Sequence, residues 1–177
     1  SWATPYQAIK QADVLIGAAA NSALLTDAEK KAVSGFAKMI QGYQFMIPAN
    51  FVYENGIRID VKDPLKPGPF VKYEEALNHI NGLLNQADQD FAAAGTGSFP
   101  LKLTPGFNNF NTLPTLRRVN KAIQARLSAY RKDWQGVLSA LNESFMNLSG
   151  SLDAGPSHPF FGPPDAFHPL FYVPYAA

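Results

Sequence analysis

The chain has 177 residues, of which 46% are hydrophobic and 16% are charged, and its formal net charge is +1. One domain is the expectation for this length, since domains usually contain about 100–200 residues. Nucleic acid is not an expected partner, because the charges are balanced and form no run of Lys and Arg. The absence of cysteine excludes disulfides and cysteine-ligated zinc. No apolar run approaches the roughly 18 residues that a membrane span needs.

The spacing of apolar residues predicts about five helices, the first of which covers residues 5–20. Thr4 is placed to cap this helix, and Pro5 would occupy its first helical position. The second helix opens with Thr26 and Glu29, which have the spacing of a capping box. Apolar residues occupy two of its faces, so we expect it to be central and buried between neighbours. Its main apolar stripe contains Val33, Phe36, Ala37, Ile40, Tyr43 and Ile47.

The other three helices are predicted over residues 73–94, 116–132 and 134–148. Glu74 and Glu75 lie in the first turn of the third helix, where they favour the positive end of its dipole, and Gly95 ends it. Asp133 is suited to cap the fifth helix. The predicted buried face of that helix contains Trp134, Val137, Leu138, Leu141, Phe145 and Leu148.

Two long connections separate these helices. In residues 50–72 a turn signal at Asn55 and Gly56 precedes alternating Ile57, Ile59 and Val61, which allows a short strand or extended hairpin. Residues 99–114 form a polar and aromatic loop, and a loop of this length is expected to be functional or to pack on another element.

The C-terminal tail, residues 149–177, contains six of the prolines and six of the aromatic residues. Proline at this density is incompatible with a helix. So much apolar surface is not expected to remain in water. The tail therefore either wraps the helices or leads into a larger subdomain outside this chain, and we favour the second alternative. The predicted organisation is a helical domain over residues 1–148 and an irregular segment over residues 149–177.

Residues 120–148 have the pattern of a tetratricopeptide-like helix pair. Ala125 is small enough for the second helix to approach closely, and Tyr130 and Trp134 are predicted to fill the space between the two helices. The expected fold is therefore all-α, built from tetratricopeptide-like antiparallel helix pairs with long loops and an irregular, proline- and aromatic-rich C-terminal tail.

Further segments precede this helix pair in a defined order along the chain. They are Tyr-Gln-Ala-Ile-Lys-Gln-Ala-Asp at residues 6–13, Leu-Thr-Asp-Ala-Glu-Lys at 25–30 with Gly-Phe-Ala-Lys at 35–38, Asn-Gly-Ile at 55–57, and Lys-Tyr-Glu-Glu-Ala at 72–76. In order and spacing these segments resemble the SusD/RagB family, the surface glycan-binding lipoproteins of Bacteroidetes. The chain departs from the family's pattern at Asp13, Phe36, Arg58 and Lys132, the last of which stands where glycine is usual.

The resemblance implies a non-catalytic component that captures a glycan or other nutrient and works with a SusC-like TonB-dependent transporter. It also implies a surface-exposed lipoprotein of the outer membrane. The lipid anchor, the N-terminal portion and a large C-terminal subdomain are then expected to lie outside this sequence. The alternative is a generic tetratricopeptide-like scaffold that binds a peptide or protein in a concave groove.

Residue patterns typical of catalysis are scarce, and we predict no enzyme, no cofactor and no metal site. Glu74 and Glu75 are adjacent on a helix and point in different directions, so an acid–base pair is disfavoured. His79 is interpreted as a surface or structural residue. Sugar rings stack on aromatic side chains, so the first candidate ligand-binding residues are the aromatics outside helical stripes. These are Trp2, Tyr172 and Tyr175, for each of which packing against a missing portion is the favoured alternative.

Overall fold

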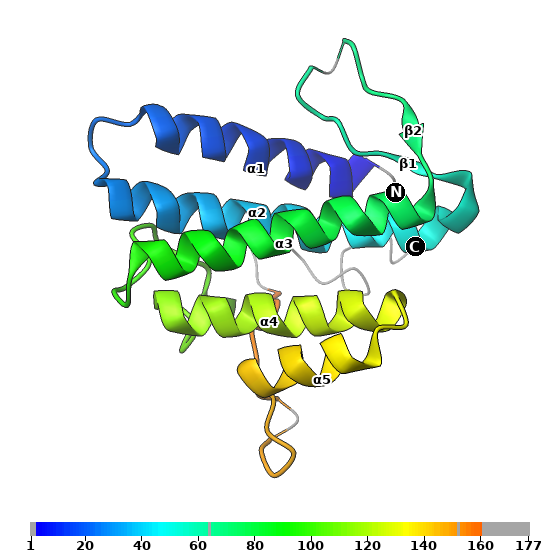
Figure 1. Ribbon diagram of the computed structural model, residues 1–177. Coiled ribbons are helices and arrows are strands. Elements are labelled where there is room, and N and C mark those ends of the chain that lie inside the picture. Colours follow the sequence, from blue (N-terminus) through cyan, green and yellow to red (C-terminus); the bar gives the residue numbers. More distant parts are fainter. Residues whose placement is uncertain (1–2, 64, 152, 161–177) are drawn as a thin grey trace, which may run out of the picture.

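The computed structural model describes residues 3–63, 65–151 and 153–160. In these ranges five α-helices lie side by side, from α1 at the top of Figure 1 to α5 at the bottom. They are α1 (Ala3–Asn21), α2 (Asp27–Val52), α3 (Tyr73–Ala94), α4 (Leu113–Tyr130) and α5 (Trp134–Glu143). The predicted all-α fold is confirmed, since the described strands form only the two-residue pair β1 (Ile57–Arg58) and β2 (Phe70–Val71).

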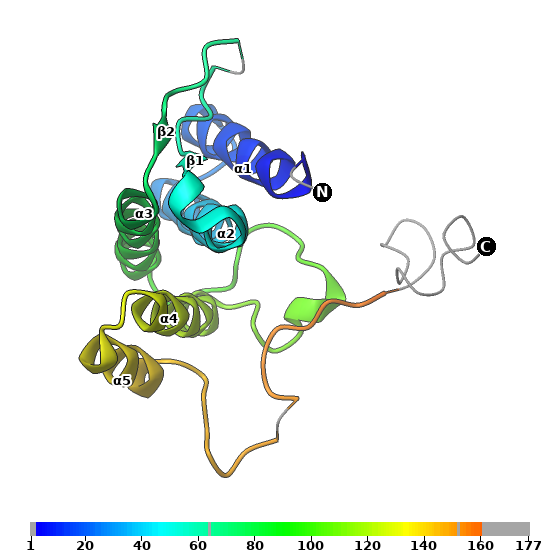
Figure 2. The same ribbon diagram turned by 90° about the vertical axis from the view of Figure 1, so that its right-hand side faces the viewer.

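Each helix packs mainly on its neighbours in the sequence: α1 on α2, α2 on α3, α3 on α4, and α4 on α5. Viewed along the helices, α3 lies on one side of α2 and α4, and the connection between α3 and α4 lies on the other side (Figure 2). The expectation that α2 is central is confirmed, because α1 and α3 both pack on it.

The close approach of α2 and α3 depends on two glycines of α2. A Cβ atom on Gly42 would lie 2.7 Å from Cδ2 of Leu84, and one on Gly35 would lie 3.1 Å from the carbonyl oxygen of Ala87. Larger side chains at these positions would push the two helices apart. The glycines therefore permit the tight packing that buries the middle of both helices.

A buried carboxylate fixes the other end of the same interface. Asp90, which is 6% exposed, accepts hydrogen bonds from Nζ of Lys38 at 2.7 Å and from Oγ of Ser34 at 2.8 Å, and Lys31 lies 3.2 Å away. Burial opposes ionisation of Asp90, but the bonds from Lys38 and Ser34 and the charge of Lys38 outweigh it and hold its pKa below the ordinary value of 3.8.

The connection between α3 and α4 packs on the core. Phe107 lies in the short 3-10 helix η2 (Pro105–Phe107). The rings of Phe99 and Phe107 contact the ring of Phe36, with centroids 4.9 and 5.7 Å from its centroid. The backbone N–H of Ser157 donates to the carbonyl of Gly106 at 2.9 Å, so the tail contacts this connection at Ser157. Of the two roles expected for so long a loop, packing on another element is therefore observed.

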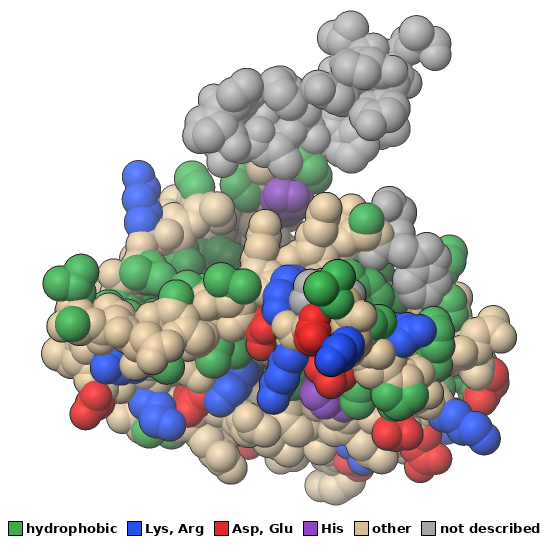
Figure 3. Space-filling view, turned by 90° about the horizontal axis from the view of Figure 1, so that it is seen from above, with side chains coloured by type: hydrophobic (Ala, Val, Ile, Leu, Met, Phe, Trp, Pro, Cys, Tyr) green, Lys and Arg blue, Asp and Glu red, His purple; other side chains and the backbone are tan. Residues whose placement is uncertain are grey.

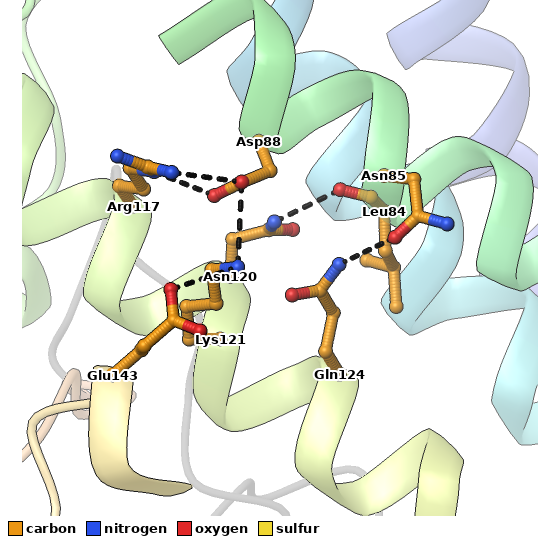
Figure 4. A network of polar contacts seen from close by, with 8 residues as sticks. All are labelled: Leu84, Asn85, Asp88, Arg117, Asn120, Lys121, Gln124 and Glu143. Atoms are coloured by element: carbon orange, nitrogen blue, oxygen red, sulfur yellow. Dashed lines mark hydrogen bonds and ion pairs between the residues drawn. The ribbon is translucent and has the colours of Figure 1, made fainter. Parts of the chain in front are cut away.

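Polar contacts tie α4 to both of its neighbours (Figure 4). Asp88 of α3 accepts from Nε of Arg117 at 2.7 Å and lies 3.3 Å from Nζ of Lys121, which in turn lies 3.1 Å from Glu143 of α5. Asn120, which is fully buried, donates from Nδ2 to the carbonyl oxygen of Leu84 at 2.9 Å. These contacts set the position of α4 relative to α3 and α5.

The predicted caps of α2 and α5 are confirmed. Oγ1 of Thr26 accepts from the N–H of Glu29 at 3.3 Å, and the Glu29 carboxylate accepts from the N–H of Thr26 at 2.8 Å. Asp133 accepts from the backbone N–H of Gly136 at 2.9 Å. These caps are predictable because they depend on side chains within one turn of the helix start.

The predicted cap of α1 is wrong, because the helix begins at Ala3 and includes Thr4. The other bounds also differ. Helix α2 continues beyond Ile47 through Pro48 to Val52, since Met46, Pro48 and Ala49 are buried and the packing of this last turn offsets the missing N–H of the proline. Helix α4 begins at Leu113, three residues earlier than predicted, and α5 ends at Glu143 rather than at residue 148.

The predicted buried face of α5 is wrong for three of its six residues, while Val137, Leu141 and Phe145 are half-buried. Trp134 is 65% exposed, Leu138 59% and Leu148 91%, and Ala140 is the buried residue of the helix. The cause is the position of α5 at the edge of the array, where α4 is its one helical neighbour among the described elements. Ala125 of α4 is buried as expected.

The predicted short hairpin in residues 50–72 is confirmed. Ile57 of β1 pairs with Val71 of β2, and the segment between the strands protrudes from the helices (Figure 1). Gly56 precedes β1 with φ of 78°, and a Cβ there would collide with the carbonyl of Val71. The hydroxyl of Tyr6 on α1 donates to the carbonyl of Arg58 at 2.8 Å, which anchors the hairpin to the helices.

The surface carries charges of both signs. On the face seen from above, acidic and basic side chains are interspersed (Figure 3), which agrees with the balanced composition. Among the described helices, none combines the length and the apolar character that crossing a membrane requires.

Candidate functional site

A groove of about 330 Å³ lies between the C-terminal half of α2 and the last turns of α4. The ends of α2 and α4 that line it face the viewer in Figure 2. We call it the tyrosine groove, and it is lined by Tyr43, Met46, Ile47, Asn50, Phe51, Arg126 and Tyr130. Binding sites for small ligands combine aromatic and apolar walls with a few polar groups, and the tyrosine groove has this composition.

Helical spacing brings the walls of the tyrosine groove together. Tyr43, Ile47 and Phe51 recur every four residues along α2, so they share one face, and they are 38%, 46% and 80% exposed. Arg126 and Tyr130 have the same spacing on α4. The α2 face is open because α1 and α3 pack on its other sides.

Arg126 is held against the tyrosines. Its Nε donates to the hydroxyl of Tyr130 at 2.8 Å, and its guanidinium carbon lies 5.6 Å from the centre of that ring. The hydrogen bond to Tyr130 is the main cause that raises the pKa of Arg126, and a weaker one to the Tyr43 side chain adds to it. These contacts fix a planar cation at the edge of the groove.

A second hollow, of about 780 Å³, adjoins the first and shares Tyr130 with it. We call it the mixed-charge cleft, because three basic and three acidic side chains line it. Its lining consists of Tyr53, Glu54, Lys72, Tyr73, Glu74, Glu75, Leu77, Asn78, Tyr130, Arg131 and Lys132. Tyr130 therefore separates an aromatic compartment with one charge from a larger polar compartment.

Two further tyrosines connect the compartments. The hydroxyl of Tyr73 donates to Oδ1 of Asn50 at 2.8 Å, and the rings of Tyr53 and Tyr73 have centroids 4.6 Å apart. Burial is the main cause that raises the pKa of Tyr73, and the nearby Tyr53 and Tyr130 raise it further. Tyr53 adopts φ of 49°, a strained value for a residue with a side chain, and its ring contacts Tyr73 at the start of α3. Ordered, amphipathic tyrosines thus border both hollows.

The residues predicted as ligand contacts, Trp2, Tyr172 and Tyr175, lie outside the described residues. The tyrosine groove was not predicted. Tyr43 was assigned to the buried stripe of the second helix, and this is wrong, because it is 38% exposed in the groove between α2 and α4. The available signal was a tyrosine, which has a polar tip, within a stripe that is otherwise apolar.

The described histidines and acidic side chains form no metal-binding cluster. Over residues 3–63, 65–151 and 153–160, no group of three or more His, Asp or Glu side chains could hold a metal ion. His79 is half-buried with its ring 5.4 Å from that of Phe45, and burial lowers its pKa, which fits a structural histidine. Glu74 and Glu75 lie in the first turn of α3 and face the mixed-charge cleft.

Comparison with known proteins gave no match to a protein-family model, to a curated protein or to a solved structure.

Proposed function

We propose that this chain is a non-catalytic module that captures a glycan or a similar polar nutrient. The observation that carries the proposal is the tyrosine groove, where exposed aromatic rings lie beside an arginine and an amide. Sugar rings present flat C–H faces that pack on aromatic side chains. Their hydroxyl groups need donors and acceptors such as those of Arg126 and Asn50.

The two adjoining hollows also have a suitable size for an oligosaccharide. Pockets for small ligands usually have volumes of about 300–1,000 Å³. The tyrosine groove and the mixed-charge cleft, about 330 and 780 Å³, each fall in this range, and they meet at Tyr130. One sugar unit could occupy the groove while further units extend into the cleft and pair with Asn78 or the glutamates.

The proposed partner is a SusC-like TonB-dependent transporter, and the proposed location is the surface of the outer membrane. Both rest on the resemblance to the SusD/RagB family. Lys132 is one of the positions at which the sequence departs from the family's pattern, where glycine is usual. Its φ of 58° lies in the left-handed region that favours glycine, so the backbone at this position supports the resemblance. A transporter gene adjacent to the gene for this chain would support the partnership.

A generic protein-binding scaffold is the second candidate. It is favoured by α5, on which Trp134 and Leu138 are one turn apart and mostly exposed. Exposed apolar residues in such a cluster often mark a protein interface.

Calorimetric titration of the full chain with a panel of oligosaccharides tests the proposal. We expect at least one glycan to bind, and Tyr43→Ala to weaken that binding about tenfold, because an aromatic contact contributes about 0.5–1.5 kcal/mol. Trp134→Ala is the matched control, since it removes an exposed aromatic residue outside the groove and should leave the affinity unchanged. Failure to bind any glycan, together with tight binding of a peptide that Trp134→Ala abolishes, would favour the scaffold instead.

A further inference from the structure

Arg126 is the one charged side chain among the residues that line the tyrosine groove. The adjoining cleft differs, since its basic and acidic side chains balance. A ligand that fills the groove therefore meets a single positive charge with aromatic and apolar surface around it. Arg126 is itself exposed, so an anionic group of the ligand can reach its guanidinium directly.

Arg126 has no carboxylate partner in the parts of the chain that the structure describes. Arg117, two and a half turns earlier on α4, is different, because its Nε and Nη2 donate to Asp88 at 2.7 and 3.0 Å. The bond that Arg126 makes to Tyr130 is to an uncharged phenol. A guanidinium carries five N–H donors, so this bond leaves donors for a ligand.

We infer that the tyrosine groove selects an acidic sugar, a uronic acid unit whose carboxylate binds Arg126 while its ring packs on the aromatic walls. This inference rests on the proposed glycan-binding function and narrows the class of glycan. The planar guanidinium matches a carboxylate and can bind it through two parallel hydrogen bonds. Tyr130 holds Nε in place, so the cation is pre-oriented before the ligand arrives.

The test compares a galacturonic acid oligosaccharide with its carboxyl-reduced analogue of the same length and linkage, by calorimetric titration of the full chain. We expect the acidic ligand to bind at least about tenfold more tightly, because a hydrogen bond to a charged group contributes about 1.5–3 kcal/mol. Arg126→Gln should reduce the ratio of the affinities for the acidic and the reduced ligand to near one. Arg126→Lys should retain part of the preference for the acidic ligand. Arg118→Gln is the matched control, since Arg118 is exposed on the same helix and lines neither hollow.

The outcomes separate the two proposals. Equal binding of the acidic and reduced ligands, unchanged in Arg126→Gln, would overturn the inference and leave the glycan-binding function standing. Failure of both ligands and of a neutral oligosaccharide panel to bind would overturn the inference and the function together. Binding of an acidic peptide in place of either sugar, abolished by Arg126→Gln, would also overturn the inference, because the groove would then select a protein segment.

Discussion

Helix α2 lies between α1 and α3, whereas α5 lies at the edge of the array against α4. In α2 the apolar residues of both packed faces are buried, and two glycines allow α3 to approach within van der Waals contact. In α5 Trp134 and Leu138 remain mostly exposed, and Ala140 is the buried residue. Both helices have an amphipathic pattern, so the number of packed neighbours decides whether that pattern is buried.

The same contrast exists within α2 itself. In its C-terminal half, Phe45 and Met46 on one face are buried in the core, whereas Tyr43, Ile47 and Phe51 on another face lie along the open tyrosine groove. The candidate site thus lies where the packing of the array ends. Substitutions in the packed region should therefore change stability, and substitutions at the open surfaces should change binding.

The largest loss of stability is expected from Leu84→Ala at the packed interface of α2 and α3. Leu84 is fully buried and would contact a Cβ on Gly42, so the substitution leaves a cavity and should cost about 2–5 kcal/mol. Urea unfolding followed by circular dichroism measures this change. A loss below about 1 kcal/mol would mean that the interface relaxes into the cavity and is less tightly packed than described.

A smaller loss is expected from Asp90→Ala, which leaves Lys38 and Ser34 without their shared acceptor. Leaving such groups unsatisfied should cost about 1–3 kcal/mol in urea unfolding. Asp13→Ala is the matched control, because its pair with Lys10 is about one-third exposed and should contribute about 0–1 kcal/mol. Equal effects of the two substitutions would contradict the assignment of Asp90 as a buried anchor.

The stability of the chain should also fall in mild acid because of His79. Burial lowers the pKa of His79, so the unfolded chain binds the proton more readily than the folded chain does. The contribution of neutral His79 to the free energy of unfolding is complete above 6.5, the ordinary pKa of histidine. It is lost as the pH falls from 6.5 through the lower pKa of His79 in the folded chain. Unfolding measured from pH 7.5 to 5 should show this slope, and His79→Gln should flatten it. An unchanged slope in the variant would assign the effect to another group.

The smallest effect on stability is expected from Leu138→Ser on the exposed face of α5. Leu138 is 59% exposed, so its replacement should change the free energy of unfolding by no more than about 0.5 kcal/mol. A loss comparable to that of Leu84→Ala would mean that this face is covered in solution, for example by a second copy of the chain. Sedimentation of both forms would then reveal the association.

Several features that depend on local sequence were predicted, although the cap of α1 was not, and the exposure of helix faces, which depends on distant neighbours, was not predicted. The capping box of Thr26 and Glu29 and the whole of α3 follow from spacing within a few residues. The exposure of Trp134 does not follow from local spacing, because the apolar pattern of a helix does not show how many other helices pack on it. For the same reason Tyr43 was assigned to the core, although it borders the candidate site.

The packing of each helix on its neighbour in the sequence also has a kinetic consequence. Contacts between adjacent elements require only short loops to close, and chains dominated by such contacts fold fast. Each pair can form once its second helix has been synthesised, so assembly can proceed from α1 toward the C-terminus. Unfolding should begin at the edge of the array, because α5 packs on one helix and each inner helix packs on two. Backbone amides of α5 are therefore expected to exchange with deuterium before those of α2.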